Sequence, residues 1–105
     1  MADENKFLKI KGGMVTGCDK SATEIAIPEG VTKIGYLAFH ECESLADITI
    51  PDSVTKIGSA AFDGCQSLAD IRFGGTVSQW KAVEKVNGPG HASKVHCTDK
   101  DVWWM

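Results

Sequence analysis

The chain has 105 residues, of which 43% are hydrophobic and 24% are charged, an ordinary balance for one globular domain. Its net charge of −3 and its scattered lysines and arginines argue against nucleic-acid binding, which needs a basic stripe. No apolar stretch approaches the ~18 residues of a membrane helix, which argues against membrane insertion.

The first predicted element is a β-hairpin in the segment KFLKIKGGMVTGC, residues 6–18. Two runs with apolar residues flank Gly12 and Gly13. A glycine pair between such runs is typical of a tight hairpin turn. We expect this hairpin to cover the first turn of the repeats that follow, within an N-terminal cap over residues 1–21.

Residues 27–72 consist of two copies of one 23-residue unit. IPEGVTKIGYLAFHECESLADIT is followed at once by IPDSVTKIGSAAFDGCQSLADIR, and the copies agree at 15 of 23 positions. A repeat of this length with an L-x-x-I-x-I core is typical of a leucine-rich-repeat solenoid. Because one unit cannot bury its own apolar face, we expect about three turns to stack.

Alternating apolar and polar residues predict one short strand in each turn. In LADITIP, residues 45–51, two isoleucines alternate with Asp and Thr, as in a strand with one buried face. Equivalent strands are expected in ATEIAIP, residues 22–28, and in LADIRF, residues 68–73. The repeats, residues 22–73, should therefore form three parallel strands joined by right-handed windings.

We expect a tight helical or 3₁₀ turn on the opposite side of each unit, around its Ala-Phe and Cys. Phe39 and Phe62 stand at equivalent positions of the two copies and are predicted to stack in the core. Gly35 and Gly58 precede these turns, where we expect the chain to bend sharply.

A helix and a second hairpin are predicted after the repeats, in a C-terminal cap over residues 74–105. In TVSQWKAVEKV, residues 76–86, Thr76 and Gln79 have the spacing of a capping box, and Val and Trp recur on one helical face. The segment NGPGHAS ends this helix. SKVHCTDKDVWW is then predicted to form a hairpin around Asp99-Lys100.

The four cysteines are predicted to be free thiols. Cys18, Cys42, Cys65 and Cys97 include no C-x-x-C pair, so neither a zinc knuckle nor a thioredoxin-type site is indicated. Without an export signal, small apolar residues in a core are the preferred interpretation. Cys42 and Cys65 occupy equivalent positions on adjacent turns, but parallel Cβ vectors oppose a disulfide between them.

The unit IPxxVTKIGxxAFxxCxSL resembles the BspA-like leucine-rich repeat, a class whose repeats have this same length. FLKIKGGMVTGCDKSATEIAIPEGVTKIG resembles the N-terminal cap of that family, and GGTVSQWKAVEK with VHCTDKD resembles the element that often closes its arrays. The resemblance covers nearly the whole chain, although family arrays usually have more repeats. The resemblance implies that the fold is an α/β solenoid, mainly β. Members of the family are microbial surface adhesion and host-interaction proteins and are not enzymes as a class.

We therefore expect a single leucine-rich-repeat domain over residues 1–105 that acts as a non-enzymatic protein-interaction module. The alternative is a structural or assembly unit that self-associates through its apolar C-terminal end. The N-terminus lacks the features of a signal peptide, so the chain as given is expected to be cytoplasmic. If the chain is a fragment of a longer protein, we expect it to be located at the cell surface or to be secreted. No cofactor is predicted, and no phosphate-binding glycine motif is present.

Stacking of equivalent repeat positions should align outward side chains in rows about 4.8 Å apart from strand to strand. The predicted partner-binding residues are Glu24, Asp47 and Asp70 in one row, and Thr49 and Arg72 in the next, beside Ala26. One interpretation is an acidic strip for a basic partner or a cation, and the preferred one is a solvated by-product of duplication. Like charges in the row should repel by under ~1 kcal/mol per pair. Lys33 and Lys56 should form a basic ladder elsewhere.

Trp103 and Trp104 are candidates for self-association. Alternation along a strand predicts that one ring points inward and the other outward. Packing within the cap is the preferred interpretation, a self-association contact comes second and a frayed tail third.

Catalytic and metal sites are not predicted. His91, His96 and Cys97 could gather a metal around the glycine-rich loop, but incidental loop and strand residues are the preferred interpretation. His96 and Cys97 are adjacent in sequence, and adjacent side chains on a strand point to opposite faces, which opposes a thiol–imidazole pair.

Overall fold

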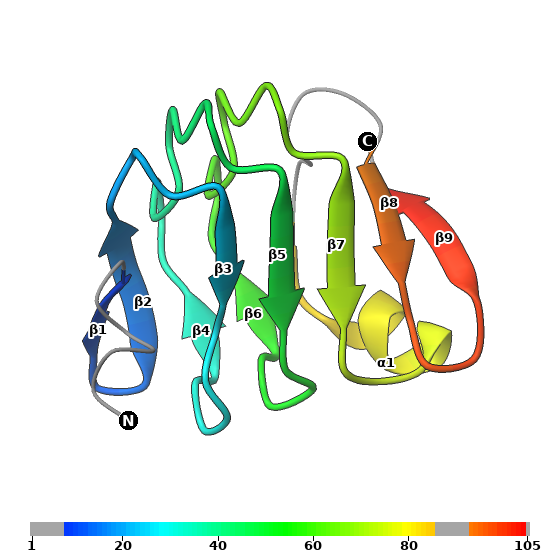
Figure 1. Cartoon of the computed structure of the whole chain (residues 1–105). Helices are drawn as coiled ribbons and strands as arrows, with labels where there is room; N and C mark the ends of the chain where they lie inside the picture. Colours follow the sequence, from blue (N-terminus) through cyan, green and yellow to red (C-terminus); the bar gives the residue numbers. More distant parts are fainter. Residues whose placement is uncertain (1–7, 86–92, 105) are drawn as a thin grey trace.

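The computed structural model describes residues 8–85 and 93–104 of the chain. Within these ranges, two β-sheets and the turns between them form a short solenoid (Figure 1). The first sheet has the order β1-β2-β4-β6 and the second has the order β3-β5-β7-β8-β9. A mainly β solenoid of about three turns is therefore confirmed. The strands are β1 (Leu8–Lys11), β2 (Met14–Cys18), β3 (Glu24–Ala26), β4 (Lys33–Ile34), β5 (Asp47–Ile50), β6 (Lys56–Ile57), β7 (Asp70–Phe73), β8 (Ser93–His96) and β9 (Asp101–Trp104).

The second sheet contains the three parallel strands that the repeat predicts. β3, β5 and β7 pair side by side with equivalent repeat positions in contact, so Ile25 lies beside Ile48 and Ile48 beside Ile71. These isoleucines are buried, and the residues between them face outward. This burial follows from the two-residue period of a strand, which turns every second side chain toward the core.

The sequence pattern does not predict β4 and β6, two strands of the first sheet. β4 and β6 are two residues long, and their pairing places Lys33 beside Lys56, as the expected basic ladder requires, and Ile34 beside Ile57. Two residues are too few to show an alternating pattern. The N-terminal hairpin, β1 and β2, continues this sheet, because β2 pairs in parallel with β4.

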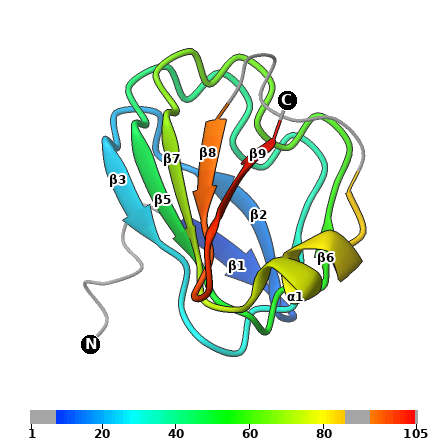
Figure 2. The ribbon, with the colours of Figure 1, turned by 90° about the vertical axis from the view of Figure 1, so that its right-hand side faces the viewer.

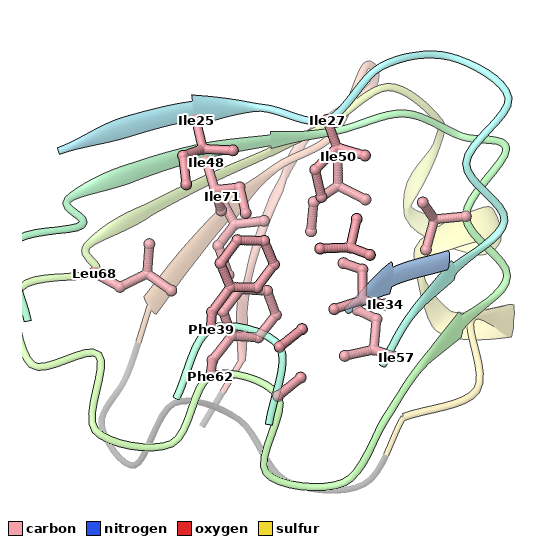
Figure 3. Close-up of a cluster of buried hydrophobic side chains, with 14 of the residues drawn as sticks. Ile25, Ile27, Ile34, Phe39, Ile48, Ile50, Ile57, Phe62, Leu68 and Ile71 are labelled. Carbon is pink, nitrogen blue, oxygen red and sulfur yellow. The ribbon is translucent and has the colours of Figure 1, made fainter. Parts of the chain in front are cut away.

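The core lies between the two sheets and is filled by stacked side chains (Figure 3). Phe39 and Phe62 are fully buried, and their parallel rings have centroids 5.1 Å apart, so the predicted column is confirmed. Trp104 extends the column with an edge contact to Phe62 at 5.7 Å. Trp80, in turn, contacts Trp104 at 5.4 Å.

Turns follow β4 and β6 and carry i→i−3 hydrogen bonds; for example, Ala38 N–H donates to the Gly35 carbonyl. Leu37 inside this bond has a φ of 59°, so the segment is a β-turn and not the expected helical or 3₁₀ turn. Close stacking explains the glycine at the start of each turn. A Cβ on Gly58 would lie 2.6 Å from the backbone nitrogen of Tyr36 and 3.1 Å from the carbonyl oxygen of Ile34. The φ of Gly58 lies outside the left-handed region. The expected sharp bend is therefore not the reason that this position needs glycine.

The predicted C-terminal helix is shorter than expected. α1 (Val77–Ala82) begins with the predicted capping box of Thr76 and Gln79, but it ends at Ala82 rather than continuing to residue 86, which lies outside the described residues. The chain leaves the helix because Glu84 pairs in parallel with Lys56 and so extends the first sheet. None of the described helical residues forms a segment long and apolar enough to cross a membrane.

The solenoid ends in a hairpin of β8 and β9, which are antiparallel. β8 lies parallel to β7 and so adds a fourth parallel strand to the second sheet. The hairpin turn is fixed to the helix, since Val77 N–H donates to Asp99 Oδ1 at 3.0 Å. Figure 2 shows α1 and this hairpin together at the end of the stack.

Candidate interaction surface

The outward side chains of the second sheet form two rows that cross its five strands. Figure 1 shows this face toward the viewer, with no described element in front of it. The strands β8 and β9 lengthen both rows beyond the residues that the repeat predicts. The first row holds Glu24, Asp47, Asp70, Lys94 and Trp103, and the second holds Ala26, Thr49, Arg72, His96 and Asp101.

Two of the three predicted carboxylates have partners on neighbouring strands. Arg72 Nε donates to both oxygens of Asp47, at 3.3 and 3.1 Å. Asp70 Oδ1 lies 2.8 Å from His96 Nε2. Among the recorded ion pairs of the described residues, none involves Glu24. The row is therefore not an uncompensated acidic strip, and pairing across the strands offsets the expected repulsion.

His96 cross-links three strands of this face. Its Nε2 contacts Asp70 on β7, and its Nδ1 lies 3.2 Å from Asp101 on β9. Lys94 Nζ lies 3.7 Å from the other oxygen of Asp101. Both ring nitrogens of His96 thus face carboxylates, which makes this side chain a polar link within the sheet.

The sequence allows a metal site on His91, His96 and Cys97. His91 lies outside the described residues. Within the described ranges, no group of three or more His, Cys, Asp or Glu side chains is placed to hold a metal ion. Burial and then the nearby Asp99 and Asp101 carboxylates raise the pKa of the Cys97 thiol, so its neutral form is favoured.

The two C-terminal tryptophans point to opposite faces, as alternation predicts. Trp104 is 7% exposed and packs against Phe62 and Trp80, so its ring is not available for the self-association contact expected of the pair. Trp103 is 63% exposed. Its ring lies beside Lys94, whose Nζ is 5.8 Å from the ring centroid, on the outer face of the second sheet.

A second exposed aromatic lies away from this face. Tyr36 is 68% exposed and lines, with Met14, Lys33 and Lys56, a hollow of about 270 Å³ at the first sheet. The repeat pattern gives no signal for Tyr36, because the second copy has Ser59 at the equivalent position.

Comparison with known proteins identifies the repeat. A family model described as BspA type Leucine rich repeat region (6 copies) matches residues 5–82. A solved leucine rich cell surface protein from Faecalibacterium prausnitzii A2-165 is 46% identical with a TM-score of 0.62, over 67% of this chain and 18% of that one. The leucine rich repeat protein of T. pallidum is 29% identical with a TM-score of 0.54, over 64% and 41% of the two chains.

A leucine-rich repeat protein from Bacteroides capillosus ATCC 29799 is 27% identical with a TM-score of 0.50, over 83% of this chain and 78% of that one. The chain spans 18% of the length of the F. prausnitzii protein and 41% of that of the T. pallidum protein, so it corresponds to only part of each. No curated protein sequence matched. Since the family model covers well over half of the chain and the paired strands recur at the spacing of the repeat, the chain belongs to the BspA-type leucine-rich repeat family.

Proposed function

We propose that the chain is a non-enzymatic protein-interaction module that binds a protein partner through the outer face of the second sheet. The observation that carries the proposal is Trp103, an exposed aromatic ring in the same row as the predicted acidic residues. Trp and Arg are enriched among the residues that dominate binding energy at interfaces. Trp103 and Arg72 supply one of each on this face.

The outer face is also preorganised for binding. Arg72 is held by Asp47, and His96 is held between Asp70 and Asp101. Side chains that are already ordered lose less conformational entropy when a partner binds. The face therefore offers an apolar anchor at one end and fixed polar groups along the strands.

The place of action is proposed from one relative. The solved protein from F. prausnitzii is described as a leucine rich cell surface protein, and the matched region is 46% identical to this chain. We propose that the chain is likewise exposed at a cell surface, as part of a longer protein, rather than cytoplasmic. Its partner would then be a secreted or surface protein.

The test is a binding screen against purified secreted and cell-surface proteins, followed by affinity measurements with matched variants. Trp103→Ser should weaken binding by about 30-fold, which corresponds to the loss of one dominant residue. Tyr36→Ser is the control, since it removes an equally exposed aromatic from the first sheet. Equal affinities for wild type and Trp103→Ser, or a larger loss in Tyr36→Ser, would contradict the proposed face.

Charge reversal tests the predicted row. Asp47→Lys should weaken binding of a basic partner and reduce its salt dependence, whereas Lys33→Glu on the first sheet should leave binding unchanged. The structure changes the stability expected of this variant. Because Asp47 pairs with Arg72, Asp47→Lys should cost up to about 1 kcal/mol rather than relieve repulsion.

Self-association is the second candidate function, and the place of β9 favours it. β9 is the last strand of its sheet, and an edge strand has unpaired backbone groups that a second copy can pair with. Trp103 lies on this strand. Light scattering across concentration should then show a dimer that Trp103→Ser abolishes. A monomer at all concentrations would leave only the heterologous partner.

A further inference from the structure

The structure brings together two thiols that the repeat does not relate. Cys18 is the last residue of β2, and Cys42 lies in the turn that follows Phe39 in the first copy of the repeat. Their Sγ atoms are 2.7 Å apart. A disulfide bond is about 2.05 Å long, so the two sulfurs need to approach by only about 0.6–0.7 Å more to become bonded.

Cys65, the repeat equivalent of Cys42, has a different partner. Its thiol donates to the carbonyl oxygen of Phe39 at 2.9 Å. Of the three thiols in this part of the core, Cys18 and Cys42 are thus the pair placed for bond formation.

We propose that Cys18 and Cys42 are an oxidation site at which a small-molecule disulfide, such as oxidised glutathione, forms an intramolecular protein disulfide. Cys18 is the half-buried member of the pair, and Cys42 is fully buried. Access therefore makes Cys18 the entry point for the reagent and Cys42 the resolving thiol.

The exchange balances in two steps. The deprotonated Cys18 sulfur attacks one sulfur of oxidised glutathione, which breaks the glutathione disulfide and releases one glutathione thiolate. The deprotonated Cys42 sulfur then attacks the Cys18 sulfur of the mixed disulfide and releases the second glutathione. Two protein thiols lose two protons and two electrons, and one oxidised glutathione becomes two reduced molecules.

The bond would tie the N-terminal hairpin to the first turn of the repeats. The two cysteines are separated by 24 positions in sequence, so the bond closes a long loop in the unfolded chain and restricts its conformations. Burial and then the contact with Cys42 raise the pKa of Cys18, so little thiolate is present at neutral pH. The exchange should therefore be slow at neutral pH and accelerate as the pH rises.

The experiment uses tryptic mapping after incubation with oxidised glutathione at mildly alkaline pH. Each cysteine falls in its own tryptic peptide: residues 12–20, 34–56, 57–72 and 95–100. We expect a loss of two hydrogen atoms from the intact mass and a cross-link between peptides 12–20 and 34–56. The oxidised chain should melt about 10 °C or more above the chain reduced with dithiothreitol.

Matched variants separate this bond from other thiol chemistry. Cys18→Ser should lose both the cross-link and the rise in melting temperature, whereas Cys97→Ser should keep both. A cross-link between 34–56 and 57–72, the repeat-related pair, would overturn the proposal. Glutathione that stays attached to Cys18 without displacement by Cys42 would also overturn it.

Discussion

Removing one ring from the stacked column tests whether the repeat stabilises the fold through its core. Among the described residues, Phe62 has two ring neighbours, Phe39 at 5.1 Å and Trp104 at 5.7 Å, whereas Phe39 has one. Both rings are fully buried. The two positions are equivalent in the repeat, so Phe62→Ala and Phe39→Ala differ mainly in this second ring contact.

Truncation of a buried Phe to Ala costs about 3–5 kcal/mol, from lost transfer energy and the cavity left behind. An aromatic pair adds about 0.5–1.5 kcal/mol beyond the area it buries. We therefore expect Phe39→Ala to cost about 3–4 kcal/mol and Phe62→Ala about 0.5–1.5 kcal/mol more. A chain of this length has a total stability of about 5–15 kcal/mol, so either variant removes a large part of it.

Urea unfolding followed by circular dichroism measures these differences in the free energy of unfolding. Phe62→Leu keeps most of the volume but loses both ring contacts, so it should cost about 1–3 kcal/mol, and it gives a measurable value if Phe62→Ala does not fold. Tyr36→Ala, at an exposed ring, should change stability by less than about 0.5 kcal/mol. A cost for Phe39→Ala equal to or above that for Phe62→Ala would refute the argument from the ring contacts.

Three further substitutions have outcomes that follow from the backbone and the surface. Gly58→Ala should lower the free energy of unfolding in urea by about 2–3 kcal/mol, since the added Cβ would meet backbone atoms at 2.6–3.1 Å. Gly17→Ala is the control and should change the free energy of unfolding little, because the nearest atom to its added Cβ is a lysine carbon at 3.6 Å. Glu41→Gly should raise the free energy of unfolding by about 0.5–1 kcal/mol, because Glu41 has a φ of 58°, which glycine adopts without strain. The second copy already has glycine at the equivalent position, Gly64. An unchanged melting temperature would count against this prediction. Hydrogen bonds from the Ser21 amide and hydroxyl lower the pKa of Asp19 below its ordinary 3.8, so its contribution is present above that pH and is lost as the pH falls through the folded value. Asp19→Asn should therefore weaken the acid dependence of stability in urea titrations at several pH values, and an identical pH profile would exclude this role.

The second sheet was predictable because its repeat strands satisfy two conditions. They are three or four residues long, enough to show alternation, and they recur at one fixed spacing along the chain. The first sheet fails the first condition, since β4 and β6 have two residues each. The length of α1 was not predictable either. The helical pattern continues past Ala82, whereas in the folded chain Val83 has an extended backbone and Glu84 pairs with Lys56.

The sequence predicts the candidate surface only on the three strands of the repeat, β3, β5 and β7. Glu24, Asp47 and Asp70 lie in one row as expected, but the period fails at the next strand. One further repeat length beyond Asp70 leads to Ser93, whereas the residue beside Asp70 is Lys94. A shift of one residue moves a side chain to the other face of a sheet. The places of Lys94 and Trp103 therefore required the structure.

The contacts between turns also bear on how such a gene changes length over generations. Gly35 lies against the Val15 carbonyl, and Gly58 lies against the Ile34 carbonyl, so each copy makes the same kind of contact with whatever precedes it. The two copies have the same length and agree at 15 of 23 positions, so misaligned recombination between their coding segments would add or remove one whole copy. The new junction then repeats an interface that the protein already has, and both ends keep their contacts. Evolution can in this way widen the exposed face by one position per row at a time, with the reading frame and the fold intact.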